Sequence, residues 1–413
     1  MNRTPAETPP LRFGSGVSGA ADLGRAVVEA GSGALESLGG APPDLALVFV
    51  SPHHAERIGQ LPALVRGSIG AGIALGCTAG GVIGAGREVE RRPGVSVTVA
   101  SLPGVGLTPF HARLVDLPPA EAPASELAGR FGLAADATRA LLMIADPFTF
   151  DPEPLLGRLD AALPITPKIG GLASGGRAPG EHALLFGDDL LDEGLIGLGL
   201  SGDVSMETIV AQGCRPIGDP MFVTRCRGNL LVELNGRPVL EVLAELFRDL
   251  PPADRELFRE ALHLGLAMRE AQTEFRQGDF LIRNILGVDE GTRTLVVGAR
   301  LRETQIVQFH VRDARTSHED LESALAAYRE RSVARSGLPD GALLFSCLGR
   351  GVHLNGEPDH DTDLFREKIG PVPLGGFFCN GEIGPVHGFT FLHGYTSCFG
   401  LFRRPSARDA QRP

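Results

Sequence analysis

Three charged side chains in the C-terminal half have the chemistry to hold a small zwitterion. Arg283 lies inside the apolar stretch FLIRN, and Arg350 stands between two glycines. A guanidinium grips a carboxylate with two parallel hydrogen bonds, so either arginine is a candidate for that half of a ligand. Glu382, in NGEIGP, lies on a glycine-rich bend and would accept an ammonium group. The alternatives are a structural ion pair for Arg283 and backbone N–H partners for Glu382.

A second set of residues has the types that covalent catalysis needs. Cys347 ends the apolar run GALLFSC shortly before Arg350, and a nearby cation favours the reactive thiolate. A hydrolase or transferase would require a nucleophile within hydrogen-bond reach of a basic histidine. The candidates are Cys347, Ser174 and Cys77 as nucleophiles, with His393 or His353 as the base. A cysteine in such a run is also a common small core residue.

Metal and nucleotide motifs fail on their spacing. The stretch DHDTD, 359–363, alternates aspartates like the start of a calcium loop, but Leu364 stands where that loop needs glycine. Its twelfth position is Gly370 instead of glutamate. GSGVSG, 14–19, matches the glycine pattern of dinucleotide sites, yet the next strand does not end in an acidic residue. The leading prediction is therefore a site without a metal, a cofactor or a catalytic residue.

Composition disfavours several classes of partner. The 413-residue chain carries a formal net charge of −11, which disfavours nucleic acid because that binding neutralises phosphates. No apolar run approaches the ~20 residues that a membrane span requires. The opening residues, MNRTPAETPPLRF, lack the apolar core of a signal peptide. The six cysteines show no CxxC spacing, and we expect reduced thiols in a cytoplasmic protein.

The elements that must position these residues follow one order three times. Each repeat is an apolar strand, a helix, a glycine-rich bend and then a second strand or hairpin. The first strands are LALVFVS (45–51), ALLMIADP (140–147) and GALLFSCLGRG (341–351). The bends are IALGCTAGGVIGAG (73–86), IGGLASGG (169–176) and LGGFFCNGEIGP (374–385). Asp151 and Asp361 are the expected N-caps of the second and third helices.

Hairpin signals fill the stretches between the repeats. Residues 220–247 and 279–301 are strand-rich, with turns expected at Asn235–Gly236 and at 289–291. Residues 251–277 and 317–332 have the pattern of amphipathic helices. We therefore predict an α+β fold with mixed β-sheets flanked by helices, in two domains, with an internal strand–helix–glycine bend–hairpin repeat.

The three bends are the expected floor of a ligand site. They place Thr78, Ser174 and Asn380 between glycines, where exposed N–H groups and a bare backbone admit a close ligand. Phe377 and Phe378 point to opposite faces if extended, so one packs in the core and the other lines the pocket. The alternative is that the glycines only let strands cross tightly.

The chain resembles the FIST family, which pairs FIST N and FIST C sensory domains. Four stretches carry the resemblance, LGCTAGGVIG (75–84), FLIRNILGVD (280–289), LFSCLGRG (344–351) and GGFFCNGEIGPVHGFTFLHGYT (375–396). It implies a FIST N-like domain at 28–236 and a FIST C-like domain at 237–398. Residues 1–27 would form a flexible tail and the start of the first strand and helix, and residues 399–413 would form a second flexible tail.

This resemblance implies an intracellular module without known catalysis that binds small molecules such as amino acids. Family members are often fused to signalling output domains, and none is expected here, so the output partner would be a separate protein. The leading prediction is a small-molecule sensor that uses Arg283, Arg350, Glu382, Asn380, Phe377, Cys347, Thr78 and Ser174. The alternatives are the hydrolase or transferase above and a protein-interaction scaffold, which would expose a large apolar patch.

Overall fold

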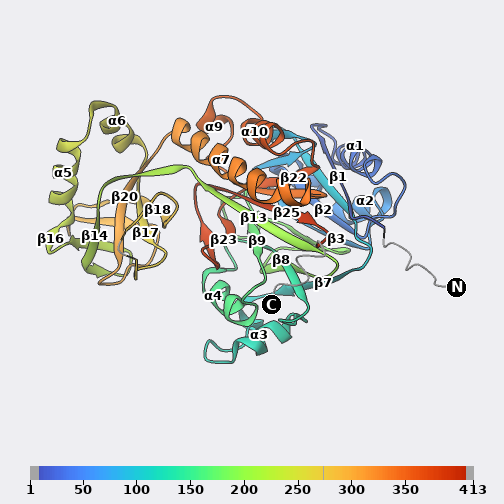
Figure 1. Ribbon diagram of the computed structural model, residues 1–413, viewed down its shortest axis with the longest axis horizontal. Helices are drawn as coiled ribbons and strands as arrows, with labels where there is room; N and C mark the ends of the chain where they lie inside the picture. The colour runs from blue at the N-terminus through green and yellow to red at the C-terminus, as the bar shows by residue number, and fades with distance from the viewer. Residues whose placement is uncertain (1–8, 273, 406–413) are drawn as a thin grey trace. The chain divides into compact units, whose positions relative to one another are not determined.

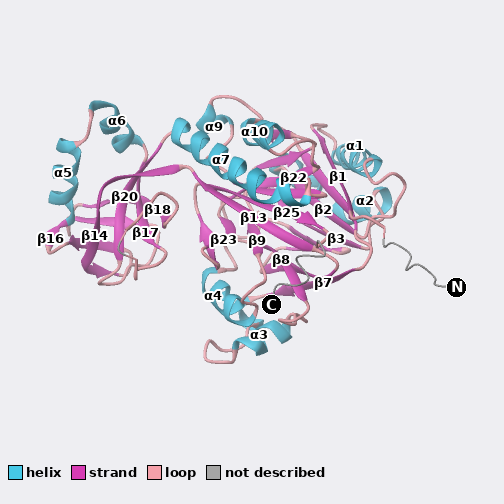
Figure 2. Cartoon of the chain, in the orientation of Figure 1, coloured by secondary structure: helices cyan, strands magenta, loops and turns pink. Residues whose placement is uncertain are grey.

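The computed structural model describes residues 9–272 and 274–405, which form two compact units. Unit 1 contains the chain up to Val210, Ala324–Leu392 and the segment from Ser397 onward. Unit 2 contains Ala211–Ser323 and the short segment His393–Thr396. The structure is α+β with mixed sheets flanked by helices, as predicted (Figure 1, Figure 2).

Unit 1 is built on three six-stranded sheets that share one strand order. The first sheet runs β1(Arg12–Ser18), β6(Val95–Ser101), β2(Leu45–Val50), β3(Ile73–Thr78), β10(Leu184–Phe186), β11(Asp189–Leu191). The second runs β7(Val105–Ala112), β12(Leu195–Gly202), β8(Thr138–Ala145), β9(Lys168–Leu172), β23(Glu382–Val386), β24(Phe389–His393). The third runs β13(Ser205–Gln212), β25(Thr396–Arg403), β21(Gly341–Cys347), β22(Leu374–Cys379), β4(Gly81–Gly84), β5(Arg87–Glu90).

The repeat seen in the sequence is confirmed, and strand register shows which residues of the three repeats are equivalent. In each sheet the central pair is parallel: β2 with β3, β8 with β9, and β21 with β22. Each second strand carries a glycine at one register position, where a Cβ would lie 1.7–1.8 Å from the carbonyl oxygen of its partner residue. The pairs are Val48 with Gly76, Met143 with Gly170, and Leu344 with Gly376. These glycines therefore permit close strand contact.

The hairpins are exchanged between repeats in a cycle. The hairpin β4–β5 of the first repeat pairs with β22 of the third, and β10–β11 of the second pairs with β3 of the first. The hairpin strand β23 of the third repeat pairs with β9 of the second. Each sheet is therefore completed by a hairpin from another repeat, which gives unit 1 a pseudo-threefold plan.

A shared core lies between the three sheets, and helices cover their outer faces. Phe49 of the first sheet, Ile144 of the second and Phe345 of the third belong to one buried cluster. Outside, the first sheet packs on α1(Leu23–Glu36) and α2(Leu61–Ser68), and the second on α3(Ala124–Arg130) and α4(Glu153–Ala162). On the third, Phe365 of α10(His360–Lys368) stacks on Phe399 at 5.5 Å. The remaining helical segments of unit 1 are η1(Pro52–Gln60), η2(Leu114–Asp116), η3(Arg329–Val333), α8(Ala334–Ser336) and α9(Val352–Asn355), and α7(Ala314–Tyr328) continues from unit 2 into unit 1.

Unit 2 is a closed β-barrel that, besides the first part of α7, has two helices among its described residues. Its strands run β14(Cys214–Arg227), β20(Ile306–Arg312), β17(Leu262–Ala267), β18(Phe280–Asp289), β19(Thr294–Val297), β15(Leu230–Leu234), β16(Arg237–Pro238), and pairing of β14 with β15 closes the ring. Its helices are α5(Val239–Asp249) and α6(Pro252–Glu260). The predicted turn at Asn235–Gly236 is confirmed between β15 and β16.

Two local predictions are wrong. The helix predicted over 251–277 ends at Glu260, and β17 follows it, because pairing with β18 and β20 decides the conformation of LHLGLA. Asp361 does not cap the third helix, since it lies inside the first turn of α10 and its carboxylate binds Arg350.

Candidate functional site

The three glycine bends of unit 1 meet at the ends of β3, β9 and β22. The N–H of Ser174 donates to the carbonyl of Thr78 at 3.2 Å, and Ser174 Oγ accepts from the N–H of Gly80 at 2.8 Å. The same hydroxyl donates to the carbonyl of Phe378. The N–H of Asn380 donates to the carbonyl of Leu172 at 3.1 Å. Residues far apart in the sequence are thus joined at one polar junction.

The hydroxyl groups at this junction already have partners within the chain. Ser174 is fully buried and bridges two bends, and Thr78 Oγ1 accepts from the N–H of Ala183 at 3.1 Å. By register, Ser174 and Asn380 occupy equivalent positions, and Gly80 is their counterpart in the first repeat. Asn380 is exposed, so its amide points to a place that a ligand can reach.

A buried aspartate–histidine pair stands beside the second bend. Asp146 follows β8, and its Oδ1 lies 2.8 Å from His182 Nδ1. The N–H of Gly176 donates to His182 Nε2 at 3.0 Å, so the imidazole carries its proton on Nδ1 and donates it to Asp146. Thr149 donates to the other carboxylate oxygen. The pair fixes the bend at Gly176, and its ring nitrogens are both engaged.

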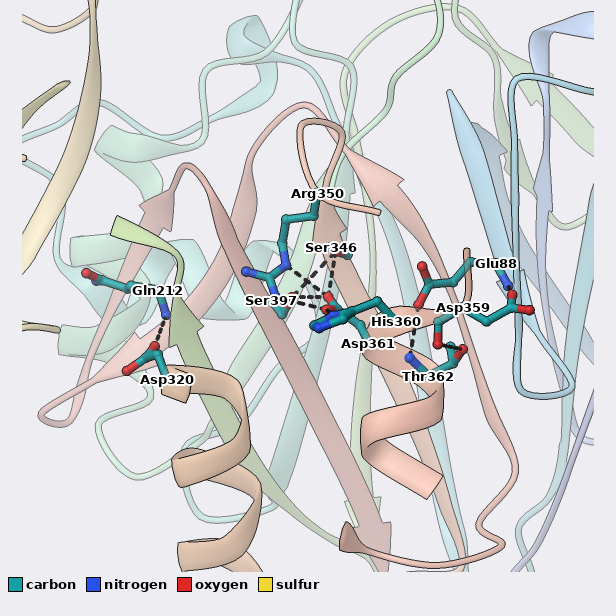
Figure 3. Close-up of polar contacts among 10 residues, drawn as sticks. All are labelled: Glu88, Gln212, Asp320, Ser346, Arg350, Asp359, His360, Asp361, Thr362 and Ser397. Atoms are coloured by element: carbon teal, nitrogen blue, oxygen red, sulfur yellow. Dashed lines mark hydrogen bonds and ion pairs between the residues drawn. The ribbon is translucent and has the colours of Figure 1, made fainter. Parts of the chain in front are cut away.

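A group of buried polar and charged side chains surrounds Asp361 (Figure 3). Arg350 donates to it from Nε and Nη2, both at 2.9 Å, in a bidentate pair. Ser397 donates at 2.6 Å, Ser346 lies at 3.2 Å, and His360 Nδ1 lies at 2.9 Å. Burial by itself would raise the pKa of Asp361, but the charge of Arg350 and these hydrogen bonds hold that pKa well below its ordinary value. Arg350 therefore grips a carboxylate of the chain itself.

The exchanged hairpin β4–β5 makes polar contacts with residues 352–362, the segment around Asp361. Asp359 accepts from Arg87 Nε at 2.8 Å and from the N–H of Glu88 at 2.6 Å. Glu88 in turn accepts from the N–H of Thr362 at 2.9 Å, and Glu90 accepts from that of Val352 at 2.9 Å. Burial, together with the nearby charge of Asp361, raises the pKa of Glu88 to about 8. The loop that carries Arg350 is thus held by polar contacts across two repeats.

The other predicted site residues fall in both units. In unit 1, Phe377 is fully buried in the shared core, with its ring 4.5 Å from that of Phe49. Cys347 is half-buried, and its Sγ lies 3.4 Å from the N–H of Gly349. Glu382 is buried on β23. Arg283 belongs to unit 2, and its guanidinium donates to the carbonyl of Ile282 at 3.1 Å. That these residues bind one ligand stays a prediction.

Sequence reasoning missed the partners of these side chains. Asp361 was assigned to a helix cap, although a buried arginine after a core strand requires a counterion nearby in space. Asp146 and His182 were not singled out, and the only signal was an aspartate directly after an apolar run, at the register position of Ser51 and Cys347.

Neither a metal cluster nor a membrane-spanning helix is found in the described part of the chain. No group of three or more histidine, cysteine, aspartate or glutamate side chains within 9–272 and 274–405 could hold a metal ion. Over the same residues, no helix is both long and apolar enough to cross a bilayer.

Comparison with known proteins gives matches along nearly the whole chain. The FIST N domain model matches residues 44–237, and the FIST C domain model matches residues 240–385. FIST domains are small-ligand sensory domains of signal transduction. The boundary between these matches differs from that between the compact units, since unit 2 begins at Ala211.

Relatives of similar length also match. An uncharacterized protein of Mycobacterium tuberculosis is 39% identical over 95% of this chain and 100% of its own length. An uncharacterized protein of Mycobacterium bovis is 36% identical over 95% of this chain and 99% of its own. Among solved structures, cyanuric acid hydrolase from A. caulinodans covers 96% of this chain and 99% of its own at 9% identity, with a TM-score of 0.34. Because the FIST N and FIST C models together match most of its length, the chain belongs to the FIST family.

Proposed function

We propose that this protein is a sensory module that binds an amino acid or a similar small metabolite in the cytoplasm and reports it to a separate signalling protein. The observation that carries the proposal is the pair of adjoining FIST matches, 44–237 and 240–385, with no further domain between them. The net charge of −11 supports a small-molecule ligand over a nucleic acid. The side chains proposed for the ligand are Arg283, Arg350, Glu382, Asn380, Phe377, Cys347, Thr78 and Ser174.

The geometry supports some of these side chains more than others. Asn380 is exposed and Cys347 is half-buried, so both are accessible from solvent. Arg350 is fully buried against Asp361, and Ser174 and Thr78 are bound to backbone groups, so their first role is to hold the bends. Arg283 is partly buried on β18, and its guanidinium donates to the carbonyl of Ile282 at 3.1 Å. We rank the charged side chains of Arg283 and Glu382, together with the exposed Asn380, first for mutation.

A screen of amino acids and related metabolites by thermal unfolding of the full chain tests the proposal. A ligand that binds only the folded state raises the unfolding temperature in proportion to the logarithm of its concentration above Kd. Arg283→Ala or Glu382→Ala removes a charge-assisted hydrogen bond of about 1.5–3 kcal/mol and should weaken binding at least ~tenfold. Arg225→Ala, an exposed arginine paired with Glu233, is the matched control. The proposal fails if no compound shifts the wild-type transition.

The hydrolase or transferase reading has less support. Ser174 Oγ donates to the carbonyl of Phe378, and the nearby imidazole of His182 accepts from Gly176 and binds Asp146. A serine nucleophile requires the opposite arrangement, with its proton directed at a histidine nitrogen. Labelling by a thiol-directed acylating reagent would test Cys347, and rapid stoichiometric labelling of this residue would favour the enzyme.

A further inference from the structure

One face of the unit 2 barrel carries a row of polar side chains across three adjacent strands. In the antiparallel register, His310 of β20 stands opposite His263 of β17, and His263 stands opposite Asn284 of β18. Paired residues share a face, and Arg312 follows His310 by two positions, so it shares this face as well. The neighbouring residue Phe309 packs in the barrel core instead. The row therefore lies on the outer side of the barrel wall.

Arg312 is buried on this face, and most of its guanidinium group makes no hydrogen bond to the described residues. The residue is 8% exposed, and neither Nε nor Nη2 has a hydrogen-bond partner among the described residues. The guanidinium of Arg312 instead contacts an aromatic ring, with its central carbon 4.7 Å from the ring centre of Tyr395. Arg350, by contrast, is buried against the carboxylate of Asp361. A desolvated guanidinium is unfavourable until an anion satisfies its donors.

The flanking imidazoles add hydrogen-bonding groups and no second charge. Burial lowers the pKa of His263 to about 4, helped by the nearby charge of Arg312, and burial lowers the pKa of His310 to about 4. Both rings are therefore neutral near pH 7. His263 Nδ1 has no hydrogen-bond partner within the part of the chain that the structure describes. The ring of His263 lies 4.3 Å from that of Tyr395, beside the guanidinium.

Apolar side chains continue the same face. Ile282 and Phe280 precede Asn284 on β18 at alternate positions, and both are buried in a small cluster with Ala267 and, at its edge, Tyr395. The ring of Phe280 lies 5.1 Å from that of His310. The face therefore combines one cation, neutral hydrogen-bonding rings and an apolar surface.

We propose that Arg312 anchors a ligand site on this face of unit 2, and that the ligand is a small monocarboxylate with an apolar group. One planar guanidinium matches one carboxylate in charge and in fork geometry, whereas a phosphate near pH 7 carries more charge than this single cation neutralises. His263 supplies a further hydrogen bond, and Phe280 and Ile282 contact the apolar group. The inference deepens the proposed sensory function by naming the chemical class of ligand that unit 2 binds, and it rests on that function.

Thermal unfolding of the full chain with sodium propionate as the probe tests the site, with sodium chloride at equal ionic strength as the reference. We expect propionate to raise the wild-type transition above that in chloride, and phosphate at the same concentration to raise it less. In Arg312→Met the effect of propionate should be lost, with at least ~tenfold weaker apparent affinity. Arg225→Met removes an exposed arginine of the same unit and should keep the wild-type response.

The stability of the variants distinguishes a ligand anchor from a structural arginine. Without propionate, Arg312→Met should unfold no earlier than the wild type, since it removes a buried charge that lacks an anion. If it does not fold, Arg312→Lys, which keeps the charge and loses the fork, should still weaken propionate at least ~tenfold. No wild-type response to propionate, an unchanged response in these variants, or a larger response to phosphate overturns the proposal. Binding of an amino acid that survives in Arg312→Met would leave the sensory function intact and refute this site.

Discussion

Replacing Glu88 with glutamine tests whether the exchanged hairpin holds a protonated acid in its interface. Glu88 is 4% exposed, and its Oε2 has no hydrogen-bond partner among the residues described. Burial raises its pKa from 4.5 to about 8. Between these two values the folded state keeps a proton that the unfolded chain releases, so stability falls as pH rises. The slope is about 1.4 kcal/mol per pH unit, or on the order of 5 kcal/mol over the interval.

Glutamine at this position resembles the protonated acid and does not titrate. Urea unfolding of the wild type and Glu88→Gln from pH 5 to pH 9 measures the difference in unfolding free energy, in which the other titrating groups largely cancel. We expect the unfolding free energy of the variant, relative to that of the wild type, to increase steadily as pH rises, so that the variant is the more stable protein at pH 9. Glu56→Gln, at an exposed position, is the matched control. A pH-independent difference for Glu88→Gln would refute a protonated buried acid.

Two further predictions concern the framework of unit 1. Asp361→Asn should lower the unfolding free energy by about 3–5 kcal/mol in urea denaturation, because it leaves Arg350 buried without its counterion. Adding Arg350→Met to this variant should recover much of the lost stability. If the two substitutions instead lower the unfolding free energy additively, the pairing is contradicted. Gly376→Ala should lower it by about 3 kcal/mol or more, since its Cβ would lie 1.8 Å from the carbonyl oxygen of Leu344. Gly157→Ala, in open space on α4, should instead be neutral or stabilising, and similar losses for both alanines would refute the close strand contact.

Local pattern was enough to predict the repeat, because each of its parts has a local physical signal. Apolar runs such as LALVFVS form buried strands, and the glycines that follow are required where a parallel strand crosses close to a carbonyl, as at Gly170. The exchange of hairpins has no such signal. Pairing of β4 with β22 joins residues nearly 300 positions apart, and only packing of the complete unit selects it.

The side chains of the site were harder to predict than the elements that carry them. Arg350 was chosen for its place between glycines, but its ion pair with Asp361 was not foreseen, because an ion pair formed across a loop leaves no periodic pattern. Arg312 was not chosen at all. In QFHVR the polar residues alternate with apolar ones, which is typical of a strand with one solvent face. The outer face of β20 is buried instead, and burial is what turns an ordinary surface arginine into a candidate anion anchor.

Because of the hairpin exchange, we expect the two units to differ in how they unfold. No repeat of unit 1 has a complete sheet without a hairpin from another, so separating one repeat breaks strand pairing in two sheets. Unit 1 should therefore unfold as one cooperative element, even though its three repeats look alike. The barrel of unit 2 closes on itself through β14 and β15, and its ring of described strands includes no hairpin strand of unit 1. A ligand bound at Arg312 should protect the amides of β17, β18 and β20 from hydrogen exchange first, because these strands carry the side chains of the proposed site.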